Sequence, residues 1–228
     1  MPDASVWRSA LRDSAPVFFG YLPLGMAFGV LFAGLGYHWL YAPLSALVIY
    51  AGSAQFLAVA LLGAGAGLTE AFVATLLLNA RHIFYGLSVL DRYPRRGVSK
   101  WYLIFGLTDE TYALVTAKRR DSQRMDVPYY VALTLLNHGY WVLGCGLGAA
   151  LQHLVAFDSS GFEFALVALF LVLLIEQLRA FNQPVLIGIT TIGSALLAVV
   201  LGTDFLLLAC ALCLIVVITD FRRTVSHG

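Results

Sequence analysis

The chain has 228 residues, of which 60% are hydrophobic and only 12% are charged, and its formal net charge is +1. A typical soluble domain carries roughly 25% charged residues, so this composition, with a mean hydropathy of +0.83, excludes an ordinary soluble protein. The balanced charge also argues against a nucleic-acid partner, which requires a strongly basic surface. We therefore expect residues 1–228 to form a single integral membrane domain in a lipid bilayer.

Seven hydrophobic runs are each near the length that a spanning helix needs, about 20 residues for a hydrocarbon core of about 30 Å. A shorter segment at 101–117 is an eighth candidate, with Asp109 and Glu110 at its centre. We predict an all-α membrane bundle of seven to eight transmembrane segments. The seven runs are 16–36, 43–63, 68–90, 130–151, 162–178, 184–201 and 204–220.

Positive residues bear on topology, because Lys and Arg favour the cytoplasmic side of a membrane. Arg222, Arg223 and the loop 118–127 are predicted to be cytoplasmic, but three spans from an internal N-terminus would place the basic loop 92–100 outside. Two interpretations stay open. Either 101–117 spans, which gives eight segments with both ends inside, or it is re-entrant and the N-terminus is external.

Helix-breaking residues occur inside several runs, and transporters use such breaks to aim half-helix ends at a substrate. Small residues spaced as in Gly25-x-x-x-Gly29 and Gly144-x-x-x-Gly148 equally allow ordinary close packing of helices. A likeness between the first and sixth runs suggests an inverted internal repeat. The predicted breaks are Pro23 and Gly25 in the first run, Gly52 in the second, and Pro184 and Gly188 in the sixth.

Asn79, Arg81 and His82 lie inside the otherwise apolar run 68–90. If this run is one helix, Arg81 lies about ten residues, or roughly 15 Å, from its end, near the middle of a bilayer. A cation there costs from about 3 to more than 10 kcal/mol, so it usually faces a bundle interior, a partner or a wet cavity. This placement predicts a transport site. The alternative is a structural ion pair with Asp109 or Glu110.

Other segments also place polar groups at membrane depth. Gly52, Ser53 and Gln55 combine small residues with an amide, so that backbone can approach a ligand and the side chain can bond it. Asp109 and Glu110 are candidates to neutralise a substrate ammonium group or to carry a proton, and the alternative is a solvated interfacial helix. No enzyme motif is present, so we expect no enzyme, cofactor or metal site.

Four motifs occur in an order and spacing that resembles the AzlC family, the larger subunit of bacterial branched-chain amino acid exporters. The resemblance covers nearly the whole chain. It implies a multi-pass permease of the plasma (inner) membrane that exports leucine, isoleucine and valine, with methionine as a further candidate, driven by the proton motive force. It also implies a small membrane partner of the AzlD type. The motifs are Pro23–Gly29, Ala51–Phe56, Asn79–Tyr85 and Thr108–Glu110.

Together these features predict a secondary exporter whose substrate cavity lies at the breaks near Pro23 and Gly52. We expect Arg81 to hold the substrate carboxylate through its guanidinium fork. Two alternatives stay open: a permease for another small zwitterion or organic acid, and a non-transporting membrane scaffold for a partner subunit. Of the other residues, Gln55 and Asn79 would orient the ligand, Gly52, Ser53 and Tyr85 would complete its site, and His82 with Asp109 or Glu110 would couple protons.

Overall fold

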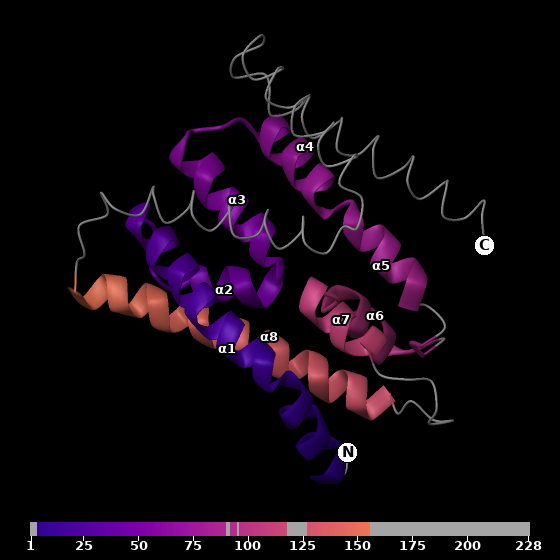
Figure 1. The fold of residues 1–228 in the computed structure, drawn as a ribbon. Coiled ribbons are helices and arrows are strands. Elements are labelled where there is room, and N and C mark those ends of the chain that lie inside the picture. The colour runs from indigo at the N-terminus through magenta and orange to yellow at the C-terminus, as the bar shows by residue number, and fades with distance from the viewer. Residues whose placement is uncertain (1–3, 90–91, 95, 118–126, 156–228) are drawn as a thin grey trace, which may run out of the picture. The chain divides into compact units, whose positions relative to one another are not determined.

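The computed structural model describes residues 4–89, 92–94, 96–117 and 127–155, and every regular element among them is an α-helix (Figure 1). The spans predicted at 162–178, 184–201 and 204–220 lie outside these residues, as do Pro184 and Gly188 of the suggested repeat. The helices are α1 (Ala4–Gly34), α2 (Tyr41–Val48), α3 (Gly52–Gly63), α4 (Leu68–Asn79), α5 (Arg81–Val89), α6 (Val98–Phe105), α7 (Asp109–Ala117) and α8 (Val127–Val155).

The chain is divided into two compact units. The first contains residues 1–63 and 81–159, and the second contains residues 64–80 and 160–228. Among the described helices, α4 therefore belongs to the second unit, and all others belong to the first. Along the sequence, Asn79 falls in the second unit and Arg81 in the first.

Helix α1 runs through 31 residues without interruption, although Pro16 and Pro23 lie inside it. The predicted breaks at Pro23 and Gly25 are therefore wrong. A proline inside a helix removes one backbone hydrogen bond, but here close packing against α8 holds the helix together. Within the described part of the chain, α1 is the one helix long and apolar enough by its length and composition to cross a membrane.

The second predicted run is divided into α2 and α3, and the residues between them include Tyr50 with a φ of 44°. This left-handed conformation is unusual for a bulky residue and ends the hydrogen bonding of α2. The break thus lies just before Gly52, near the predicted position. Gly52, Ser53 and Gln55 themselves form the first turn of α3.

The segment predicted at 101–117 also contains a break, at residues 106–108 between α6 and α7. These helices have 8 and 9 residues. At a rise of 1.5 Å per residue each is about 12 to 14 Å long, well short of a hydrocarbon core of about 30 Å. Neither helix can cross a bilayer alone.

Helices α1 and α8 cross at close range through two pairs of glycines. A Cβ atom built on Gly25 would lie 3.0 Å from the Cys145 backbone nitrogen, and one on Gly29 would collide with the Cys145 carbonyl oxygen. In the same way, a Cβ atom on Gly148 would collide with backbone of Met26. The sequence allowed two roles for these small-residue motifs, close helix packing or a functional helix break. The structure shows that they serve close packing.

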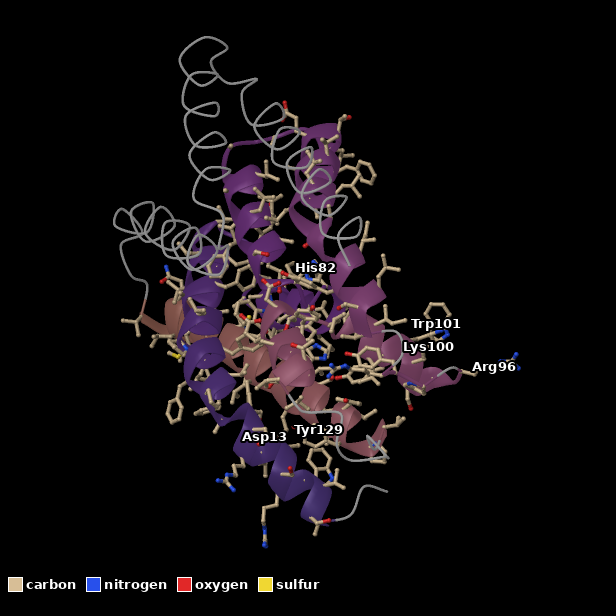
Figure 2. The ribbon with its side chains drawn as sticks, turned by 45° about the vertical axis from the view of Figure 1, so that its right-hand side comes forward. Asp13, His82, Arg96, Lys100, Trp101 and Tyr129 are labelled. Atoms are coloured by element: carbon tan, nitrogen blue, oxygen red, sulfur yellow. The ribbon has the colours of Figure 1, made fainter. Side chains whose placement is uncertain are left out.

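One end of this helix pair is fixed by polar and aromatic contacts. The Tyr129 hydroxyl donates a 2.6 Å hydrogen bond to Asp13 Oδ2, and the two side chains meet in Figure 2. An apolar cluster surrounds this end, and Tyr93, Leu103 and Tyr130 are among its buried members. Figure 2 also shows Arg96, Lys100 and Trp101 projecting outward, and Trp101 is 72% exposed. Exposed Trp beside basic residues is typical of a membrane–water interface.

Large apolar side chains also face outward from the helices. Phe19 on α1, Leu44 on α2 and Leu143 on α8 are each more than half exposed, and Phe72 and Ile83 on α4 and α5 are similarly exposed. Soluble monomers rarely expose so much apolar surface, whereas a lipid-facing protein requires it. The exposed surface therefore agrees with the membrane class predicted from composition.

Candidate functional site

Polar side chains gather inside the first unit, where α3, α7 and α8 face α1. Two backbone breaks border the gathering, one before Gly52 and one at residues 106–108. Polar groups in an apolar interior are costly unless they are paired, so their partners decide what the cluster can do. We call these residues the polar cluster: Tyr21, Tyr50, Gln55, Thr108, Glu110, Thr111, Asn137, His138 and Trp141.

Thr108 caps the N-terminus of α7. Its carbonyl accepts the first helical hydrogen bond from the Tyr112 nitrogen at 2.8 Å, and its Oγ1 accepts one from the Thr111 nitrogen at 3.3 Å. Such a cap satisfies backbone donors that would otherwise lack partners. Asp109 and Glu110 follow in the first turn, where negative charge is favoured by the helix dipole. The Thr108-Asp109-Glu110 motif is thus the start of a helix inside the protein.

Tyr21 of α1 connects this helix start to the long helix pair. Its one hydroxyl proton is shared between two acceptors, Glu110 Oε2 at 2.6 Å and Thr108 Oγ1 at 2.8 Å. The ring of Tyr21 is buried, whereas the Glu110 side chain is exposed on its other side. A carboxylate held at one oxygen and open at its edge can exchange a proton or receive a cationic group.

Asn137 of α8 joins the same network from the opposite direction. Its Nδ2 donates to Thr111 Oγ1 at 3.0 Å, and the Thr108 hydroxyl also donates to Thr111 Oγ1, at 3.1 Å. Asn137 is fully buried, and its Oδ1 accepts no hydrogen bond from the described residues. The Tyr50 hydroxyl, on a side chain that is 3% exposed, likewise has no partner among them.

His138 closes the end of the broken helix α2. Its Nε2 lies 3.2 Å from the Ala46 carbonyl oxygen, which in a continuous helix would accept from the Tyr50 backbone nitrogen. A carbonyl only accepts, so Nε2 carries a proton, and in the neutral ring Nδ1 accepts from the Tyr102 hydroxyl at 3.3 Å. The ring also stacks on Tyr50 with a centroid distance of 4.2 Å. His138 therefore stabilises the kink that positions Tyr50.

Gln55 of α3 uses both ends of its amide within the protein. Its Oε1 accepts from Trp141 Nε1 at 2.8 Å, and its Nε2 donates to Ser45 Oγ at 3.0 Å. Gly52 lies against the same indole, since a Cβ atom there would sit 3.2 Å from the ring. These contacts fix the start of α3 on α8. Phe28 and Phe56 pack around the Trp141 ring and supply an apolar wall.

Tyr85 and His82 lie on α5, outside the polar cluster. Their rings are 5.6 Å apart, and Tyr85 stacks on Tyr112 of α7 at 4.5 Å. The Ser88 hydroxyl adds a 3.1 Å hydrogen bond to the Tyr112 hydroxyl. Helix α5 is thereby attached to α7, the same helix whose first turn carries Asp109 and Glu110.

The predicted site residues are therefore brought together only in part. Glu110 and Gln55 enter the polar cluster directly, and Gly52 borders it through Trp141. The Arg81 side chain lies outside the described part of the structure, and Asn79 belongs to the second unit. Pro23 and Gly25 serve the contact of α1 with α8, not a helix break. The residues predicted for the site did not include five further members of the cluster: Tyr21, Tyr50, Asn137, His138 and Trp141.

Comparisons with known proteins match this chain to a family described as AzlC protein, over residues 16–155. An uncharacterized membrane protein of Helicobacter pylori J99 is 35% identical over 95% of both chains. The branched-chain amino acid transport protein AzlC of Bacillus subtilis is 33% identical, covering 98% of this chain and 88% of its own. The inner membrane protein YgaZ of Escherichia coli is 31% identical over 65% of this chain and 62% of its own. No solved structure matches.

Proposed function

The chain belongs to the AzlC family of membrane proteins, and from this premise we propose that it is the large subunit of a secondary transporter that exports branched-chain amino acids across the inner membrane. The observation that supports this most is the polar cluster. Helices that are otherwise apolar bring buried amides and hydroxyls together inside the protein, and the exposed carboxylate of Glu110 joins them at their edge. Buried polar groups between membrane helices usually mark a substrate or ion pathway.

An aliphatic amino acid suits the chemistry of this region. Its ammonium group requires acceptors, which Glu110 and the neighbouring hydroxyls supply, and its side chain requires an apolar wall such as Phe28 and Phe56. One methylene in such a wall changes binding by only about 1 to 3 kcal/mol. We therefore propose overlapping use of leucine, isoleucine and valine.

The substrate carboxylate requires a cationic or dipolar partner, and we assign this role to Arg81. Arg81 begins α5, and α5 is attached to α7 through the stacked rings of Tyr85 and Tyr112. This attachment supports a connection between the Arg81 end of α5 and the helix that carries Glu110. Gln55 holds its two partners within the protein, so we assign it a positioning role, while Asn79 and Ser53 remain proposed ligand contacts.

Energy is proposed to come from the proton motive force, since the sequence contains no nucleotide-binding loop. Glu110 is the proposed proton carrier because one of its oxygens is held by Tyr21 while the side chain stays exposed. Asp109 and His82 are proposed to assist it. A small AzlD-type subunit is the proposed partner, and the exposed apolar helix faces provide surface for it.

The decisive experiment is counterflow of labelled leucine in proteoliposomes that contain this chain and its small partner, with and without an imposed pH gradient. Uptake that responds to the gradient and is lost in Arg81→Gln supports the proposal. Matched liposomes without the partner test the requirement for a second subunit. No leucine uptake by folded protein would reject this function and favour either another cargo or a scaffold role.

A further inference from the structure

Two buried polar atoms in the polar cluster have no partner among the described residues. They are the Tyr50 hydroxyl, on a residue 3% exposed, and Asn137 Oδ1, on a residue fully buried. A buried polar atom without a partner costs about 1 to 3 kcal/mol. Two such atoms in one network therefore require an explanation. A bound ligand that donates hydrogen bonds to both atoms is an explanation that a binding experiment can test.

The two atoms belong to the same network. The Asn137 amide donates through Nδ2 to Thr111. Its Oδ1 is the acceptor of the same amide and is left for a ligand. The Tyr50 hydroxyl lies close enough to Glu110, Tyr21 and Thr111 to interact with them electrostatically. No hydrogen bond of normal distance and angle joins it to any described residue. Tyr50 is held in this place by its positive φ and by stacking on His138.

The character of these groups selects the ligand. A carboxylate, an amide oxygen and a phenol oxygen are all acceptors, and the carboxylate adds negative charge. A primary ammonium group presents three donors and one positive charge, which matches this set. A hard metal ion fits less well, because it requires about six oxygen ligands and usually several carboxylates. The described residues contain no cluster of three metal-ligating side chains.

We propose that Glu110, Asn137 and Tyr50 form a binding subsite for a primary ammonium group. This inference rests on the proposed function, in which the group is the α-ammonium of the transported amino acid. The exposed side of Glu110 gives the ligand access, and the two orphan atoms then receive its remaining protons. Tyr50 is then a residue that determines specificity for the ammonium group, and the kink before α3 positions it.

The test uses the full chain with its partner subunit in lipid nanodiscs and three labelled probes. Leucine carries both charged groups, 3-methylbutylamine lacks the carboxylate, and 4-methylpentanoate lacks the ammonium. The decisive variant is Tyr50→Phe, because it removes only a hydroxyl that has no partner in the described structure. Its control is Tyr93→Phe, which removes another buried, unpartnered hydroxyl, from the apolar cluster at the N-terminal end of α8.

We expect Tyr50→Phe to weaken binding of leucine and of 3-methylbutylamine about tenfold, the effect of one hydrogen bond to a charged group. Binding of 4-methylpentanoate should not change, and the Tm of the ligand-free protein should not fall. Asn137→Leu should likewise weaken binding of leucine and of 3-methylbutylamine and leave binding of 4-methylpentanoate unchanged. Tyr93→Phe should leave all three affinities unaltered.

The outcomes separate the two proposals. If leucine binds but 3-methylbutylamine does not, or if Tyr50→Phe affects all three probes equally, the subsite is refuted while the transport function stands. If the amine binds in the expected pattern but leucine does not bind, the subsite stands and the branched-chain function is refuted. Unchanged affinities in Tyr50→Phe would assign the orphan atoms to bound water instead.

Discussion

The Tyr21 hydroxyl donates a 2.6 Å hydrogen bond to Glu110 Oε2, although the two residues are 89 positions apart in the chain. This bond joins the long helix α1 to the first turn of α7, and the same hydroxyl reaches the Thr108 cap. The contact therefore holds a proposed proton carrier and the start of its helix in one place. It explains how the short helix α7 is held in a defined position beside α1.

Replacing Tyr21 with Phe should reduce leucine transport at least tenfold, because Glu110 and Thr108 both lose a donor. Leaving a buried acceptor without its partner also costs about 1 to 3 kcal/mol of stability. The measurement is leucine counterflow together with the Tm in detergent. Tyr140→Phe is the control, since the Tyr140 hydroxyl bonds Ser14 elsewhere on the same helix pair. Equal transport in the two variants would contradict the role of Tyr21.

The glycine crossing of α1 and α8 predicts effects of opposite sign for the same substitution. Gly148→Ala places a methyl group against Met26 backbone, which cannot yield, so overpacking should destabilise the protein by about 1 to 3 kcal/mol. Gly20→Ala and Gly139→Ala meet nothing within 4 Å, and in a helix this change favours folding by up to about 1 kcal/mol. Thermal unfolding measures all three. A Gly148→Ala protein as stable as Gly139→Ala would contradict the close crossing.

The helix breaks show where sequence reasoning succeeds and where it fails. Composition is enough to predict helices in a membrane, because each backbone group must be satisfied without water. It cannot tell which breaker acts. Proline is the stronger helix breaker, yet α1 continues through Pro23 and α2 ends before Tyr50. The difference is tertiary, since Gly25 and Gly29 hold α1 against α8, whereas Tyr50 is held outside its helix by His138.

As with the helix breaks, only part of the polar cluster could be predicted from the sequence. Gln55 and Glu110 could be predicted because an amide and a carboxylate are conspicuous in apolar runs. Tyr21 and Tyr50 could not, because tyrosine is ordinary in a membrane protein and its importance depends on partners far away in the chain. The adjacent Asn137 and His138 gave a usable signal, since two polar residues lie inside the otherwise apolar run 130–151. Each proves to complete a contact with another element.

The two hydrogen bonds of the Gln55 side chain predict how much stability each of two substitutions should cost. Gln55→Leu leaves both the Trp141 Nε1–H and the Ser45 hydroxyl without the amide, so the free energy of unfolding should fall by about 2 to 4 kcal/mol. Ser45→Ala removes one of the two bonds and should cost about half as much. Chemical unfolding in mixed micelles gives the comparison, with intrinsic Trp fluorescence as the readout. A larger loss in Ser45→Ala than in Gln55→Leu would show that the amide is not the centre of this contact.

The bond from Tyr129 to Asp13 predicts how stability depends on pH at the membrane surface. Burial, followed by the hydrogen bond to Asp13 and its negative charge, raises the pKa of Tyr129 above its ordinary value of about 10. A group whose pKa is raised by folding stabilises the protein below its unfolded pKa, and this stabilisation is lost as the pH rises toward the folded value. The Tm should therefore be insensitive to Tyr129 between pH 6 and about 9 and fall above about pH 10. Tyr129→Phe should lower the Tm at neutral pH but flatten this alkaline decline, and Tyr37→Phe, on an exposed side chain, should change neither. An alkaline decline as steep in Tyr129→Phe as in the wild-type protein would mean that another group ionises there and that the hydrogen bond to Asp13 does not set the limit.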